Sequence, residues 1–374
     1  LGRCAQARGD FESALDHAVR GIDEIEGVRE QLGEEDLRTS YRVSKRTVYA
    51  LAVEALDSVG GADRDQARAR QALEIVHQAK ARELVDRLAL AATPAPASTE
   101  RPDGNLLVEY FIGGTDLFRW SLLDGTVRMQ NLGPADALLD GVADVHRGLS
   151  AGRRPDAAVL DRLSDTLLGG LVEILPAARS ITISADGALH NLPFELLPFG
   201  GSLLVERFDG VNYLPSGALG SIARRDADSG RVSLGIGQPD RRSSPSGFLS
   251  RRYELGPLAA AAEELDQLQA WIGSPVEVYT GAGATEETFA GRYVDGLRIL
   301  HVATHTVLDE ASGSSAILLT PGEGSDGLLH PREIARLQGT ADLTVLAACR
   351  TAAGQDAAGS ARNTLTGAFL FNGI

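Results

Sequence analysis

The sequence is poor in cysteine, methionine and aromatic residues: its 374 residues include 2 Cys, 1 Met and only 5% aromatic residues. The two cysteines, Cys4 and Cys349, stand near opposite ends of the chain and can build neither a thiolate metal cluster nor a disulfide framework. Such sparing use of cysteine is typical of a reducing compartment. We therefore expect a cytoplasmic protein that holds no metal.

Long apolar runs are also missing. The longest ones, Leu88–Ala92 and Val345–Cys349, are far too short to span a bilayer. No basic start followed by an apolar stretch marks a signal peptide, so we expect no membrane attachment. The first residue is Leu1 rather than Met, and we expect the natural N-terminus to lie upstream of it.

Basic residues are outnumbered by acidic ones, 36 to 51, which gives a net charge of −15. This surplus argues against binding of phosphate backbones, so direct nucleic-acid binding is not expected, although a local basic patch stays open. Neither a Walker-type phosphate loop nor a Gly-x-Gly-x-x-Gly pattern after a strand occurs, which leaves a nucleotide-binding domain without support. The length is enough for two or three domains.

Residues 1–92 have the apolar spacing of helices. Apolar side chains recur every three or four positions, as at Leu15, Val19, Ile22 and Ile25. Further helices are expected over residues 39–59 and about 64–92. Such helix pairs resemble tetratricopeptide (TPR) repeats, and residues 9–15 look like the turn and second helix start of one. The 34-residue period does not repeat cleanly, so a plain helical bundle remains the alternative.

A proline-rich stretch follows, and after it the periodicity changes. Pro94, Pro96 and Pro102 exclude a continuing helix, and we interpret residues 93–104 as a linker. Beyond it, short apolar runs alternate with helical stretches, which predicts an α/β fold with a mostly parallel central sheet and helices on both sides. The expected strands are residues 106–112, 118–123, 180–184, 232–236, 276–279, 297–303 and 343–348; the expected helices are residues 134–149, 157–175, 258–272, 285–289 and 331–337.

Two of these strands end next to residues that suit nucleophilic catalysis. His305 follows the strand 297–303, and Cys349 follows the strand 343–348, 44 residues later with one helical crossover between them. Reactive groups in open α/β sheets collect beyond the carboxyl ends of the strands. If the two strands are neighbours, the His305 imidazole can take the thiol proton of Cys349.

Taken alone, each of the two residues has an ordinary structural reading. A lone cysteine at a strand end is more often a small buried residue than a nucleophile, and a lone histidine has many structural uses. The pair at matching strand ends is the more specific signal. His301 lies inside its strand and His190 near a turn, and we interpret both as structural.

Four segments together resemble the CHAT domain, a caspase-like peptidase domain often found behind TPR repeats. Ala348-Cys349-Arg350, with His305 upstream, is also close to the caspase signature. The resemblance covers roughly residues 105–374 and implies a caspase-like three-layer sandwich. The segments that carry it are residues 183–198, 280–285, 300–305 and 345–354.

The resemblance implies an endopeptidase with a dyad of His305 and Cys349 and no cofactor. The oxyanion donors expected for acyl transfer are the backbone N–H groups of Cys349 and Thr306. The expected partners are a protein substrate and a regulatory protein or complex that acts on the TPR-like helices. Family context adds bacterial defence or cell death as a setting.

The sequence departs from the family pattern in three places. Thr306 stands where many caspase-like enzymes have Gly, and Ala347 stands where metacaspase-type relatives have an acidic residue for a basic P1 side chain. Asp309 or Asp326 is a weaker candidate for that substrate pocket, because exposed loop acids are common. The chain stops at Ile374, where the resemblance expects at least one further strand, so C-terminal strands are expected to be missing.

Two hypotheses of different classes follow. The first is a cysteine endopeptidase with a helical TPR-like region at residues 1–92, a linker at 93–104 and a CHAT domain at 105–374. The second is a non-catalytic interaction scaffold that keeps the caspase-like fold, which Thr306 and Ala347 keep open. Loop-like stretches at residues 241–252 and 354–362 are candidate mobile or cleavable segments.

Overall fold

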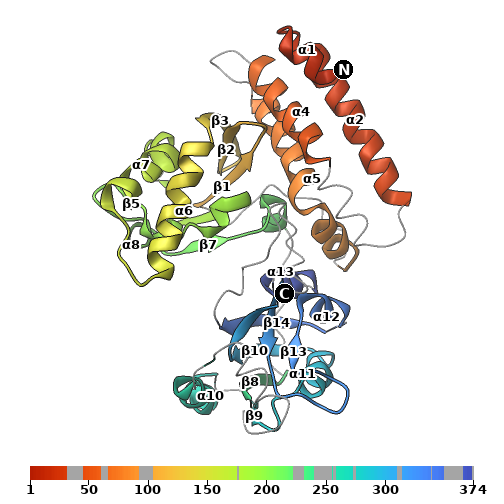
Figure 1. The fold of residues 1–374 in the computed structure, drawn as a ribbon, viewed down its shortest axis with the longest axis vertical. Helices are drawn as coiled ribbons and strands as arrows, with labels where there is room; N and C mark the ends of the chain where they lie inside the picture. Colours follow the sequence, from red (N-terminus) through yellow and green to blue (C-terminus); the bar gives the residue numbers. More distant parts are fainter. Residues whose placement is uncertain are drawn as a thin grey trace. The chain divides into compact units, whose positions relative to one another are not determined.

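The computed structural model describes most of the chain as two compact units (Figure 1). The first consists chiefly of residues 1–85 and 95–222, and the second chiefly of residues 223–356 and 360–374. The residues left undescribed are 32–44, 60–65, 92–103, 175–176, 222–230, 240–254, 256–257, 273–274, 310–313, 338, 349–364 and 373–374. The predicted linker thus lies almost wholly outside the described residues. Cys349 and both loop-like segments, residues 241–252 and 354–362, lie wholly outside them.

Amphipathic helices open the first unit, as the apolar spacing predicts. The chain breaks at Gly9, whose φ of 76° favours glycine, and the Asp10 side chain then accepts a hydrogen bond from Ser13 N at 3.1 Å to start the next helix. The helices are α1 (Gly2–Ala7), α2 (Phe11–Gln31), α4 (Arg46–Val59) and α5 (Gln66–Ala91).

The first sheet has the strand order β3-β2-β1-β4-β7 among the described residues. The predicted strands 106–112 and 118–123 correspond to β1 and β2, which form an antiparallel hairpin, whereas β4 and β7 run parallel to β1. The sheet is therefore mixed rather than mostly parallel, and β3 and β7 were not predicted. Its strands are β1 (Asn105–Ile112), β2 (Asp116–Leu123), β3 (Thr126–Pro134), β4 (Ser180–Ser184) and β7 (Val211–Tyr213).

Helices cover both faces of this sheet because the side chains of β1 alternate between two apolar cores. Val108 and Tyr110 pack with α6 (Asp136–Ser150) and α7 (Ala157–Leu168), whereas Phe111 packs with α2, α4 and α5. Trp120 of β2 joins the second core and donates from Nε1 to the Ala69 carbonyl of α5 at 3.0 Å. The N-terminal helices thus form the second of these two cores together with one face of the sheet.

A buried ion pair also joins α5 to this sheet. The Lys80 ammonium lies 2.7 Å from the Glu109 carboxylate and 2.6 Å from the Ser184 hydroxyl, and all three side chains are at most 4% exposed. Gly217 N donates to the second oxygen of Glu109 at 2.6 Å, with His77 beside it at 3.4 Å. Burial alone would raise the pKa of Glu109, but the Lys80 and His77 charges outweigh it and hold that pKa well below its usual range.

Two further polar links join α4 to the strand ends of the same sheet. Arg46 pairs with Asp186, which also accepts from Ile112 N at 2.7 Å. Glu54 accepts from Gly114 N at 2.6 Å in the turn after β1. Asp186 follows β4, so the Asp-Gly turn of the family-like segment 183–198 binds a cation of the helical region.

The second unit contains a sheet in which every described strand is parallel, in the order β14-β10-β8-β9. All four strands were predicted. Leu265 and Leu268 of α10 (Ala259–Ile272) pack against this sheet together with Ala303 and Ala347. The strands are β8 (Ser233–Pro239), β9 (Val276–Gly281), β10 (Leu297–Ala303) and β14 (Ala341–Ala347).

The connection from β10 to β14 contains more than the single helix expected. A three-stranded antiparallel sheet, β11-β12-β13, precedes α12 there. Phe289 and Tyr293 of α11 contact Phe369 of α13 in an aromatic cluster. These elements are β11 (Thr306–Asp309), β12 (Ser314–Leu318), β13 (Leu328–Leu329), α11 (Glu286–Tyr293), α12 (Pro331–Arg336) and α13 (Leu365–Phe371).

Within the described parts of the chain, no helix has the length and apolar character needed to cross a bilayer.

We predict that Lys80→Met lowers the free energy of unfolding by about 3–5 kcal/mol, because it leaves the buried Glu109 carboxylate without its charge partner. Arg147→Met is the matched control, since the Arg147–Asp144 pair is 3.0 Å long but exposed on α6, and its loss should cost less than about 1 kcal/mol. Urea denaturation followed by circular dichroism measures both. Equal stability losses in the two variants would contradict this account of the network.

Candidate active site

Direct parallel pairing of β10 with β14 places the ends of the two strands that precede His305 and Cys349 in the sequence next to each other. The register matches Ala303 with Ala347, the last residue of each strand. His305 stands two positions after Ala303, and Cys349 stands two positions after Ala347. Cys349 itself lies outside the described residues, so no distance joins its sulfur to the His305 ring.

His305 is anchored through its backbone and the residue before it. Its carbonyl accepts from Leu318 N at 2.9 Å. The Thr304 hydroxyl, only 2% exposed, donates to the Leu318 carbonyl at 2.7 Å. The side chain of His305 is half-buried at the carboxyl end of the sheet. Two hydrogen bonds to one residue of β12 therefore fix where β10 ends.

Thr306, the predicted oxyanion donor, begins β11 opposite Ile317. Hydrogen-bonded and non-hydrogen-bonded pairs alternate in an antiparallel ladder. Since the His305 carbonyl bonds Leu318 N, the pair of Thr306 and Ile317 is of the second kind. The Thr306 N–H consequently points away from β12, and its buried Oγ1 has no hydrogen-bond partner among the described residues.

The two weaker substrate-pocket candidates lie in different local settings. Asp309 ends β11, opposite Ser314 of β12. Asp326 is exposed and accepts from Leu328 N at 2.9 Å, which shapes the turn into β13. Asp326 thus has a turn-forming role in the structure.

His301, interpreted as structural from the sequence, is 6% exposed and its Nε2 lies 2.9 Å from Glu264 Oε1. Glu264 belongs to α10, so this contact holds the helix against β10. The structural interpretation fits this contact.

Glu286, at the start of α11, is a residue that the sequence analysis missed. Its carboxylate accepts from Gly327 N at 2.7 Å, in the turn that leads to β13. Burial, the largest cause, raises the pKa of Glu286 to about 7; the Gly327 N–H lowers that pKa, and the neighbouring charges of Glu333, Asp326 and Glu287 raise it further. No sequence motif marks this residue, because its environment comes from segments about 40 residues away.

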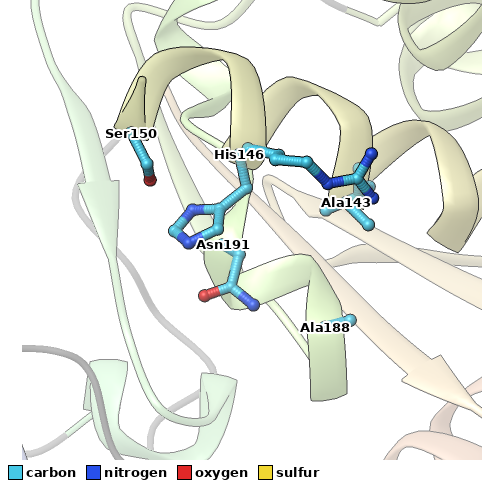
Figure 2. Close-up of a pocket in the computed structure, with 7 residues that line it drawn as sticks. Ala143, His146, Ser150, Ala188 and Asn191 are labelled. Carbon is cyan, nitrogen blue, oxygen red and sulfur yellow. The ribbon is translucent and has the colours of Figure 1, made fainter. Parts of the chain in front are cut away.

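A pocket of about 420 Å³ lies in the first unit, between α6 and the turn η3 (Gly187–Asn191). Figure 2 shows the imidazole of His146 near the amide of Asn191 there. None of the residues predicted for catalysis lines it. The complete lining is Val142, Ala143, His146, Arg147, Ser150, Ala188 and Asn191.

Comparison with known families adds one match. The CHAT domain family matches residues 157–374, more than half of the chain. The matched segment holds all of the second unit's sheet and the strands β4 and β7 of the first. Comparison with curated proteins gives no match.

We predict that Thr304→Val lowers the free energy of unfolding by about 1–3 kcal/mol, because it leaves the buried Leu318 carbonyl without its hydroxyl donor while keeping the side-chain shape. Thr166→Val is the control: its hydroxyl bonds the Arg162 carbonyl on an exposed turn of α7, so the change should stay within about 0.5 kcal/mol. Urea denaturation of both variants measures the difference. A Thr304→Val protein as stable as the wild type would refute the anchoring role.

Glu286 should make the stability of the second unit fall as the pH rises. Its folded pKa of about 7 lies above the unfolded value of 4.5, so the folded state binds the proton more tightly. The stabilising contribution is complete below pH 4.5 and is lost on the way to about pH 7. Thermal unfolding measures this effect: between these pH values, the melting temperature of the wild type should fall more than that of Glu286→Gln. Glu263→Gln is the control, because Glu263 is exposed on α10, and its melting temperature should change with pH as that of the wild type does.

Proposed function

The chain belongs to the CHAT domain family, which is related to the caspase-like peptidases, and on this premise we propose that it is a cysteine endopeptidase with Cys349 as nucleophile and His305 as base. The observation that carries the proposal is the register of β10 with β14. Ala303 pairs with Ala347, and His305 and Cys349 each stand two positions beyond these paired residues in the sequence.

The reaction follows from the chemistry of the two groups. His305 takes the proton of Cys349, and the thiolate attacks a peptide carbonyl of the substrate. The backbone N–H groups of Thr306 and Cys349 stabilise the oxyanion, and the direction of the Thr306 N–H away from β12 supports this role. The imidazolium then protonates the leaving amine, and water, activated by His305, releases the acyl group from the sulfur.

The anchoring of His305 also supports the proposal. A general base acts only from a fixed position within hydrogen-bond reach of the proton that it takes. The Thr304 hydroxyl and the His305 carbonyl both bond Leu318, so the residue enters the site from a backbone held on β12. Substrate-pocket roles for Asp309 and Asp326 remain weaker parts of the proposal.

The finer architectural and regulatory expectations belong to the same proposal. We propose that the second unit adopts a caspase-like three-layer sandwich, which the packing of α10 on one face of its parallel sheet supports. The N-terminal helices, proposed to be TPR-like, receive a regulatory protein. The same proposal includes a cytoplasmic location, which the sparing use of cysteine favours, and a role in bacterial defence, which rests on the family context alone.

The alternative function is a non-catalytic scaffold that uses the caspase-like fold to bind other proteins. Two sequence features favour it. Thr306 replaces the glycine that often follows the histidine, and Ala347 replaces the acidic residue of metacaspase-type relatives. A scaffold requires no reactive thiol, which separates the two functions experimentally.

Replacement of either dyad residue should remove or strongly lower peptide cleavage, measured on a proteome-derived peptide library by mass spectrometry. We expect Cys349→Ala to remove cleavage and His305→Ala to lower it by about 10²–10⁴-fold, since the proton acceptor is lost. Cys4→Ala and His146→Ala are the matched controls, because Cys4 is exposed on α1 and His146 lies in the first unit. Both control proteins should cleave as the wild type does.

An electrophilic peptide probe separates the enzyme from the scaffold in the same proteins. The peptidase requires fast labelling of Cys349 that depends on His305, with only slow labelling of Cys4. Slow and equal labelling of both cysteines, together with no cleavage, would reject the peptidase and leave the scaffold.

A further inference from the structure

Two glycines of β8 leave room for different neighbours. At Gly237, an added Cβ would lie against the carbonyl oxygen of Ala303 and 2.6 Å from its carbonyl carbon. At Gly235, an added Cβ would meet Leu268 Cδ1 at 2.6 Å and Leu265 Cδ2 at 3.1 Å. A methyl group at position 237 would therefore clash with backbone atoms, which cannot move without moving the strand. A methyl group at position 235 would meet only the flexible ends of two leucine side chains.

The close approach at Gly237 occurs where β10 ends. Gly237 pairs with Ala303, the last residue of β10, and the register of β8 with β9 shifts between Ile236 and Pro239. Such irregularities in a strand redirect its end, and glycine inside a strand often marks a close approach of another backbone. Gly237 is itself buried.

The end of β10 is thus held from two sides. On one side, the Ala303 carbonyl occupies the space that a side chain at position 237 would need. On the other side, Thr304 and His305 form hydrogen bonds with Leu318 of β12. A shift of Ala303 by a side chain at position 237 is passed along two covalent residues to His305.

We propose that Gly237 is a positioning residue: the absence of a side chain there sets the place of the His305 imidazole. This inference rests on the proposed function for its catalytic consequence. It requires no contact between Gly237 and the substrate, because the glycine acts only through the backbone of β10. Misplacement of a reacting group by about 1 Å costs about 100-fold in rate.

The test compares Gly237→Ala with Gly235→Ala in the full chain. We expect Gly237→Ala to lower kcat/KM for a cleaved library peptide about 100-fold, mainly through kcat, and Gly235→Ala to change it less than threefold. The rate of Cys349 alkylation by iodoacetamide is measured from about pH 5 to about pH 10. The pH at which this rate reaches half its maximum should be higher in Gly237→Ala alone, because the imidazole no longer favours the thiolate.

A spectroscopic readout keeps the inference separate from the proposed function. The chain has 7 histidines. In spectra of protein labelled with ¹³C-histidine, the signal of His305 is identified as the one that disappears in His305→Gln. Gly237→Ala should move the His305 signal and Gly235→Ala should not. A wild type without any cleavage rejects the peptidase, but a selective shift of the His305 signal would still support the positioning role.

Three results would overturn the inference. They are an unmoved His305 signal in folded Gly237→Ala, unchanged cleavage by that variant of an active enzyme, and equal changes in both glycine variants, which would show a general packing effect. If Gly237→Ala does not fold, Thr304→Val releases the same strand end from its other side. That variant must then move the His305 signal, and failure to do so contradicts the positioning role.

Discussion

The parallel pairing of β10 with β14 is the constraint on which the functional interpretation depends. Parallel strands bring their carboxyl ends to one edge of a sheet, and a side chain just beyond each strand can meet its neighbour there. The register of Ala303 with Ala347 makes the offsets of His305 and Cys349 equal. A strand inserted between the two would add a further strand spacing of about 4.8 Å between the residues, and a register slip of one residue would offset them by about 3.3 Å along the strands. The rest of the second unit, from the glycines of β8 to the Leu318 anchor, fixes this edge.

Much of the fold was predictable because long apolar runs and helical periodicity mark elements reliably. All four strands of the parallel sheet, the hairpin of β1 and β2, and α6, α10 and α12 were expected within a few residues. The short strands β7 and β13 were missed, since two or three residues carry no periodicity, and β11 and β12 were hidden in a stretch interpreted as a crossover. The candidate dyad was readable from strand ends, but its anchors were not: Thr304 and Gly237 matter through the backbones that they approach. The Lys80–Glu109–Ser184 network was also not predicted, because Lys and Glu are usually exposed and only the fold brings these three segments together.

The first unit shows how family boundaries and structural boundaries can differ. The family match starts at residue 157, yet β1, the strand that joins β2 to β4, comes from residues 105–112. The segment 183–198 that carries part of the resemblance uses Asp186 to bind Arg46 of α4, and its Glu195 accepts from Tyr213 of β7 at 2.6 Å. These acidic residues therefore hold the first unit together, whereas the dyad positions belong to the second.

The shared core and buried ion pair of the first unit have an evolutionary consequence. Lys80 comes from the helices, Glu109 from β1 and Ser184 from β4, so a change in any one of them alters the solvation of the other two. A recombination event at residues 93–104 that joined these helices to a sheet without the Glu109 carboxylate would leave the buried Lys80 ammonium unpaired. An exchange of helical regions therefore keeps this core stable only where the incoming sheet also carries an acid for Lys80, or where the charged pair is replaced together by apolar residues.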